Sequence, residues 1–246
     1  MLDKLRTARG VMRSLGVYYG RKSRSAEKDR LYTQFVKTGD LVFDVGAHVG
    51  DRVASFRRLG ARVVAIEPQP ALAFTLKMLY GRDRNVTIET KAVGKTPGTL
   101  KMKINIDNPT VSTASSAFID AARGAHGWEG QVWEKTIAVP VTTIDALMEA
   151  HGIPAFVKID VEGFEGEALA GMTRPVEVLS FEFTTIQRDV AQACIARCAA
   201  LGFQRYNAAI GESQELGKWR SAEDIGRWLL ELPHAANSGD IYARMA

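Results

Sequence analysis

The chain has 246 residues, of which 46% are hydrophobic and 24% charged. This is long for one minimal domain, short for two, and ordinary for a soluble globular protein. Its two cysteines, Cys194 and Cys198, are too few for a disulfide framework or a zinc site. No apolar stretch approaches the roughly 18 residues of a membrane span. The net charge of +4 comes from the beginning of the chain, since residues 1–30 carry nine basic and three acidic side chains.

Residues 1–37 are basic and helical in pattern, and we interpret them as an extension in front of a main domain at residues 38–246. We expect this helix to pack on the main domain; a lid over the substrate or a contact with an anionic surface are alternatives. Without the apolar core of a signal peptide, the chain is expected in the cytoplasm. No aromatic-studded basic stripe predicts nucleic-acid binding. The residues that can share one helix face here are Leu2, Leu5, Met12 and Leu15.

From residue 40 on, short apolar strands alternate with helices, which predicts a parallel sheet with helices on both faces. The strands are nearly continuous in apolar residues, as is typical of strands buried on both faces. The expected strands are residues 41–46, 61–68, 85–90, 136–141, 155–160 and 176–183. The expected helices are residues 50–59, 70–81, 142–150, a segment ending at 169, and 186–201.

Five further segments complete the expected α/β, doubly wound fold. Residues 91–107 predict a hairpin or a strand extension that turns at Thr96, Pro97 and Gly98. Residues 108–135 are rich in small and polar side chains and predict an insertion that covers the active site. Residues 202–208 and 238–246 predict a closing antiparallel strand pair, separated by a variable helical loop at 208–237.

The segment from Asp44 to Gly50 lies where the first strand ends and a helix begins. Its glycines, Gly46 and Gly50, let the backbone approach a ligand, and a helix amino terminus offers free N–H groups. A dinucleotide site needs the pattern Gly-x-Gly-x-x-Gly, but His48 stands where the middle glycine would be, which argues against NAD or FAD. The alternative is a turn that needs glycine for its geometry alone.

Glu67 ends the second strand, 23 residues after Asp44. A carboxylate at that edge can accept hydrogen bonds from both hydroxyls of a ribose. Asp44, at the end of the first strand, is placed to hold an ammonium group. A ligand with a ribose and an amino-acid tail but no phosphate fits this pair, and S-adenosylmethionine is such a ligand.

Three carboxylates follow the strand at residues 155–160, namely Asp160, Glu162 and Glu165. We expect packed acids to raise one another's pKa, which suits a general base that accepts the proton of an acceptor hydroxyl. Capping of the following helix is the alternative explanation for Glu162 and Glu165. No metal ligands are assigned, although Mg²⁺ held by this cluster stays an alternative. Glu182, at the end of the next strand, is a reserve acid.

The ordered motifs FDVGAHVGD, AIEPQP, KAVG and KIDVEGFE resemble the FkbM family of methyltransferases over residues 38–206. The resemblance implies a class I methyltransferase fold with an antiparallel last strand, S-adenosylmethionine as donor, and O-methylation. It also implies that Asp160 lies beside the reaction centre. We expect Asp160, assisted by Glu162, to accept or orient the proton of the acceptor hydroxyl. The donor-site residues that it implies, together with His48 in the same turn, are Asp44, Gly46, Gly50, Glu67, Ala92 and Val93.

The function expected from these patterns is methyl transfer from S-adenosylmethionine to a hydroxyl of a sugar, glycan or natural product. A nucleotide-cofactor oxidoreductase and a catalytically silent S-adenosylmethionine-binding module are the alternatives. The identity of the acceptor and the oligomeric state are not indicated by any motif.

Overall fold

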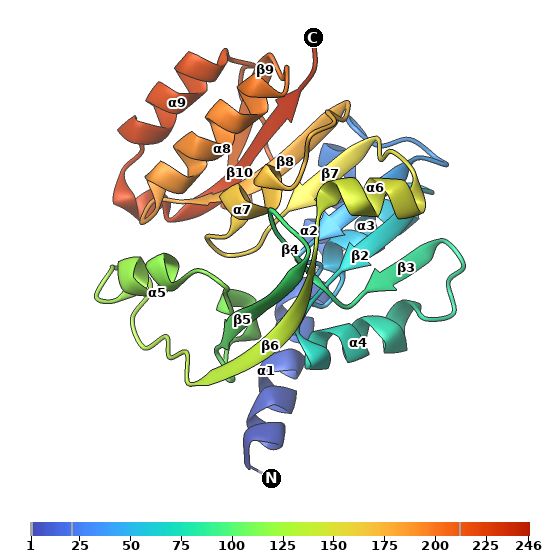
Figure 1. The fold of residues 1–246 in the computed structure, drawn as a ribbon, viewed down its shortest axis with the longest axis vertical. Coiled ribbons are helices and arrows are strands. Elements are labelled where there is room, and N and C mark those ends of the chain that lie inside the picture. The colour runs from blue at the N-terminus through green and yellow to red at the C-terminus, as the bar shows by residue number, and fades with distance from the viewer. Residues whose placement is uncertain (1, 21, 212) are drawn as a thin grey trace.

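A seven-stranded sheet forms the centre of the computed structural model, which describes residues 2–20, 22–211 and 213–246 (Figure 1). The strand order is β3-β2-β1-β7-β8-β10-β9, and β10 alone runs antiparallel to its neighbours. The expected mostly parallel, doubly wound sheet with an antiparallel last strand is therefore confirmed. Its strands are β1 (Leu41–Val45), β2 (Arg62–Ile66), β3 (Val86–Glu89), β7 (Phe156–Ile159), β8 (Val178–Thr184), β9 (Arg205–Ile210) and β10 (Ser238–Arg244).

Helices cover both faces of this sheet. Val42 and Val63 face the helices α2 and α3, whereas Phe43 and Val64 face the helices α6 to α9. Successive residues of a strand point to opposite faces, so an apolar run such as that of β1 is buried on both sides. The helices are α1 (Leu2–Tyr19), α2 (Lys22–Tyr32), α3 (Asp51–Arg58), α4 (Pro70–Tyr80), α5 (Ser116–Ala122), α6 (Ile144–His151), α7 (Glu165–Ala170), α8 (Arg188–Ala200) and α9 (Ala222–Glu231), with short 3-10 turns at Pro109–Val111 and His234–Ala236.

A second sheet of three strands corrects the expectation for residues 91–107. Strands β4 (Ala92–Val93) and β5 (Gly98–Ile104) do not pair with each other as a hairpin, because β6 (Lys135–Thr142) lies between them. The expected core strand at 136–141 belongs to this sheet as well. The physical reason is visible in β6, which alternates between exposed and covered residues, as an antiparallel strand with one open face does.

The amino-terminal segment forms two helices, and the face of α1 that packs is different from the expected one. Of the four expected residues, Leu2, Leu5 and Met12 are exposed, and Leu15 is partly buried against the cluster around Val11. The buried residues of α1 are Gly10, Val11 and Ser14. The second helix packs through Lys28, which is buried and paired with Asp51 of α3. In the described part of the chain, none of the helices combines the length and the apolar character that crossing a bilayer requires.

The end of the chain forms the expected antiparallel pair, since β9 and β10 are hydrogen-bonded from Arg205↔Arg244 to Ile210↔Gly239. Helix α9 lies in the connection between them. The segment at residues 108–135 connects β5 to β6 and contains α5. Both features place loops at the carboxyl ends of the parallel strands, where ligands bind in open α/β sheets.

Candidate functional site

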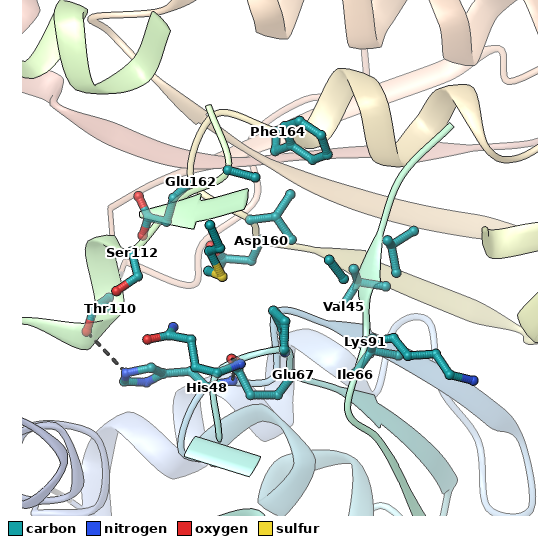
Figure 2. A pocket seen from close by; sticks show the side chains of 18 of the residues that line it. Val45, His48, Ile66, Glu67, Lys91, Thr110, Ser112, Asp160, Glu162 and Phe164 are labelled. Carbon is teal, nitrogen blue, oxygen red and sulfur yellow. Dashed lines mark hydrogen bonds between the residues drawn. The ribbon is translucent and has the colours of Figure 1, made fainter. Parts of the chain in front are cut away.

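One cavity at the carboxyl ends of β1, β2 and β7 is lined by most of the predicted site residues. It encloses about 720 Å³, including its open mouth. Figure 2 shows Glu67 and His48 on one side of it and Asp160 and Glu162 on the other. The predicted residues that line it are Gly46, His48, Glu67, Ala92, Val93, Asp160 and Glu162, whereas Asp44 and Gly50 do not.

Gly46 makes the turn after β1 possible. Its backbone is left-handed, with φ of 84°, and a Cβ atom at this position would lie 1.8 Å from the carbonyl oxygen of Asp160. No other residue type fits so close to the neighbouring strand end. Gly50 is needed for a different reason. A Cβ atom at this position would lie 2.7 Å from side-chain atoms of Leu76 and Tyr80. Gly50 is therefore required for packing of the turn against α4.

Glu67 closes the cavity at the end of β2. Its side chain is 2% exposed, and its two carboxylate oxygens accept the backbone N–H groups of His48 (3.0 Å) and Gln69 (2.8 Å). Burial raises the pKa of Glu67 to about 8, although these two hydrogen bonds lower it and Asp44 adds to the rise. Each oxygen keeps a second lone pair for a further donor. Glu67 is thus a rigidly held acceptor at the cavity wall.

Asp44 is buried in β1 and does not line the cavity. In the register of the sheet it is the partner of Lys158, and both side chains point to the α2–α3 face. Neither carboxylate oxygen of Asp44 has a hydrogen-bond partner among the described residues. Burial raises the pKa of Asp44 to about 7. An orphaned buried carboxyl group of this kind calls for a partner that the chain itself does not provide.

Asp160 is held by two cations. Its Oδ2 atom lies 3.2 Å from Nζ of Lys158 and 3.3 Å from Nη2 of Arg52. Burial alone would raise the pKa of Asp160, but Lys158 and Arg52 outweigh it and lower the pKa to about 2. The expectation that crowding raises this pKa is therefore wrong for Asp160. Lys158 itself is buried and also donates to Asp240 of β10 at 2.7 Å.

The expectation of a raised pKa holds for the other acids of this group. Burial, together with the charge of Asp160, holds the pKa of both Glu162 and Glu182 well above the usual value. One carboxylate oxygen from each of these three residues lies within 4.8 Å of the others, a grouping that suits either shared protons or a divalent cation. The reserve acid Glu182 is thus brought to the site by β8, the neighbour of β7.

Glu162 has an unusual backbone. With φ of 54° it is left-handed, and its carbonyl oxygen accepts the hydroxyl of Thr113 at 2.6 Å. His48, on the opposite wall, is also left-handed, with φ of 49°. Non-glycine residues in this conformation are uncommon and gather at functional sites. Both therefore support the assignment of the cavity as the site.

Glu165 does not share the role of the other acids. Its Oε1 atom accepts the N–H groups of Val161 (3.0 Å) and Gly163 (3.3 Å) at the start of α7. Glu165 does not line the cavity. As the first residue of α7 it places a negative charge in the first turn of the helix, and it holds the turn that precedes the helix, but it does not cap the helix with its side chain.

Several cavity residues were not identified from the sequence. Arg52 stands at the second position of α3 and reaches Asp160. A cation one turn after a glycine-rich strand end is the signal that could have found it. Tyr18 comes from the amino-terminal extension, and its ring packs edge-on against His48. The remaining polar or aromatic residues of this kind are Gln69, Lys91, Thr110, Ser112 and Phe164.

Comparison with known proteins identifies relatives. Residues 44–236 match the protein family described as the methyltransferase FkbM domain. The hexuronic acid methyltransferase AglP of Haloferax volcanii is 30% identical over 168 residues, which are 65% of this chain and 62% of that protein. The chain therefore spans less than two thirds of the length of that relative.

Solved structures with a similar fold include a precorrin-6y C5,15-methyltransferase from Geobacter metallireducens, with 14% identity, a TM-score of 0.45 and coverage of 91% of this chain and 87% of that chain. A TehB-like SAM-dependent methyltransferase from Corynebacterium glutamicum has 11% identity, a TM-score of 0.46 and coverage of 89% and 88%.

Proposed function

This chain belongs to the FkbM methyltransferase family, and we propose that it transfers the methyl group of S-adenosylmethionine to a hydroxyl group of a sugar or glycan. One observation carries the proposal: a single cavity is lined by the glycine turn after β1, by Glu67 at the end of β2 and by the acids Asp160 and Glu162 after β7. These elements provide a donor site and a proton acceptor side by side.

The chain's own residues fit the donor. Glu67 offers free lone pairs to two ribose hydroxyls, and Gly46 lines the cavity next to it. Asp44 has two buried oxygens without a partner in the described part of the chain, which favours a positively charged ligand. When bound, S-adenosylmethionine supplies an electrophilic methyl group on a sulfonium.

Asp160 and Glu162 have different roles at the acceptor hydroxyl. Asp160 stays ionised because Lys158 and Arg52 hold it, so it accepts a hydrogen bond from the acceptor hydroxyl and orients it. Glu162, with its raised pKa, takes the proton as the hydroxyl oxygen attacks. The enclosing walls position the oxygen and exclude water, which supplies a large part of the rate.

A sugar or glycan is the proposed acceptor class. The relative from Haloferax volcanii is named a hexuronic acid methyltransferase. In this chain, Thr110 and Ser112 place hydroxyl groups on the cavity wall, where they can bond to acceptor hydroxyls (Figure 2). A cytoplasmic location is part of the proposal, because both cysteines are free and buried, as suits a reducing compartment.

Ligand binding followed by turnover tests the proposal against its alternatives. We expect S-adenosylhomocysteine to raise the melting temperature, because a ligand stabilises the state it binds by RT ln(1 + [L]/Kd), and NADH to leave it unchanged. Mass spectrometry then measures the gain of one methyl group on uronic-acid glycosides. Neutral hexose glycosides are tested in parallel as matched acceptors. A shift with NADH would favour an oxidoreductase. Donor binding without transfer to any hydroxyl acceptor would favour a silent binding module.

A further inference from the structure

Large apolar side chains are gathered on the outer surface of two helices, α1 and α4. In the described part of the chain, 12 large apolar residues are exposed, and eight of them lie on these helices. Met12 is 66% exposed, Phe74 64% and Met78 71%. We call this the α1–α4 surface; its exposed apolar members are Leu2, Leu5, Met12, Val17, Tyr19, Phe74, Met78 and Leu79.

The packing of α1 does not account for this exposure. The helix is held to the body of the protein by the opposite face, through Gly10, Val11 and Ser14. Figure 1 shows α1 extending away from the sheets beside α4. A groove between the two helices is lined by Met12, Phe74 and other residues of both. Large apolar side chains that gather on one exposed face indicate a surface that a protein, a ligand or a membrane covers.

Basic side chains stand among the apolar ones. Arg9 and Arg13 are exposed on α1 and share its outer face with Leu2, Leu5 and Met12 by helical spacing. Neither forms an ion pair with any residue that the structure describes. The nearby acids Asp107 and Glu134 are already paired with Arg6. Arg9 and Arg13 therefore stay available to an external anion.

We propose that the α1–α4 surface docks on an anionic lipid bilayer. An anionic bilayer binds protein surfaces that combine two features. Apolar side chains enter the headgroup region, and flanking arginines contact the lipid phosphates. A second copy of the chain fits less well, because a two-fold interface would set Arg9 and Arg13 of one copy against the same patch of the other. This inference concerns binding alone and does not depend on the proposed methyl transfer.

Vesicle sedimentation with the full-length protein tests this inference. The probes are vesicles of phosphatidylcholine alone and vesicles of phosphatidylcholine and phosphatidylglycerol in equal parts. We expect binding to the mixed vesicles only, weakening with added salt because exposed charges are screened. The variant Met12→Ser/Phe74→Ser should bind roughly tenfold or more weakly because apolar burial is lost. The variant Arg9→Gln/Arg13→Gln should also lose roughly tenfold or more.

Matched controls come from the opposite edge of the sheet. Ile210→Ser/Leu230→Ser removes comparable exposed apolar side chains, and Arg205→Gln/Arg227→Gln removes two exposed cations. We expect both to bind like the unaltered protein. All substituted residues are exposed, so circular dichroism and melting should be unchanged. Equal sedimentation with neutral vesicles, or losses as large in the control variants, would overturn the proposal. So would a dimer in solution that Met12→Ser/Phe74→Ser dissociates while vesicle binding is absent.

Discussion

Replacement of Glu67 by alanine should weaken donor binding far more than it changes the fold. Glu67 lines the cavity. Each of its two carboxylate oxygens has one lone pair beyond the hydrogen bond that it accepts from the backbone N–H of His48 or Gln69. Hydrogen bonds to a charged group contribute about 1.5–3 kcal/mol. Losing one such bond lowers affinity roughly ten- to a hundredfold, so Glu67→Ala should weaken the binding of S-adenosylhomocysteine by at least this factor, as measured by titration calorimetry.

The pH dependence of this affinity sharpens the prediction. In the free protein the pKa of Glu67 is raised from 4.5 to about 8, so the carboxyl group is mostly protonated at neutral pH. Ribose hydroxyls that donate to it favour the ionised form, and donor binding then releases a proton. Affinity should rise as the pH increases from about 6 to about 8. Glu67→Gln, which cannot ionise, should flatten this dependence.

The matched control is Glu89→Ala. Glu89 ends the neighbouring strand β3, but its carboxylate pairs with Lys91 and His151, and it does not line the cavity. Removing it should leave donor affinity unchanged. If a folded Glu67→Ala protein binds S-adenosylhomocysteine as tightly as the unaltered chain, Glu67 only orders the turn, and the assignment of the donor site to this edge fails.

Three further predictions concern the buried charges. Glu162→Gln should lower methyl transfer by about 10²–10⁴-fold with donor affinity retained. Asp160→Asn removes the charge that helps to raise the pKa of Glu162, so it should move the acidic limb of the pH–rate profile to lower pH. An unmoved limb, or activity that chelators abolish, would argue for a metal role instead. Lys158→Met should destabilise the protein by about 3–5 kcal/mol in urea unfolding, because it leaves buried carboxylates unpaired; an unchanged midpoint would contradict the ion-pair assignment. The ligand-free protein should lose stability as the pH rises from 6.5 to about 8, since the folded-state pKa values of Asp44 and Glu67 are raised and their contribution is lost as these groups ionise. Below this window the buried His48, with its pKa lowered to about 4, acts in the opposite direction. A melting temperature that rises between pH 6.5 and about 8 would show that Asp44 and Glu67 are not buried as described.

The sequence by itself predicted the main sheet, apart from the strand at residues 136–141, and the sheet edge at which Glu67 and Asp160 line one cavity. Continuous apolar runs that end in Asp44, Glu67 and Asp160 are local features, and parallel strands bring such ends to one edge whatever the loops do. The glycine at position 46 is likewise a local requirement, because the turn after β1 needs its backbone conformation. These predictions depend on neighbours along the chain, and a single sequence contains that information.

Only the tertiary structure decided how the site is charged and which surfaces are free. The pKa of Asp160 falls because Lys158 and Arg52, from β7 and α3, both reach its Oδ2 atom, and the pKa of Glu162 rises because Asp160 lies beside it. Electrostatic energies depend on distances between atoms of segments far apart in the chain, which residue spacing does not contain. For the same reason, helical periodicity grouped Leu2, Leu5 and Met12 on one face but did not determine that this face is the exposed one. The side of a helix that packs is selected by its neighbours, and here Gly10, Val11 and Ser14, with Leu15 beside them, lie against the rest of the protein.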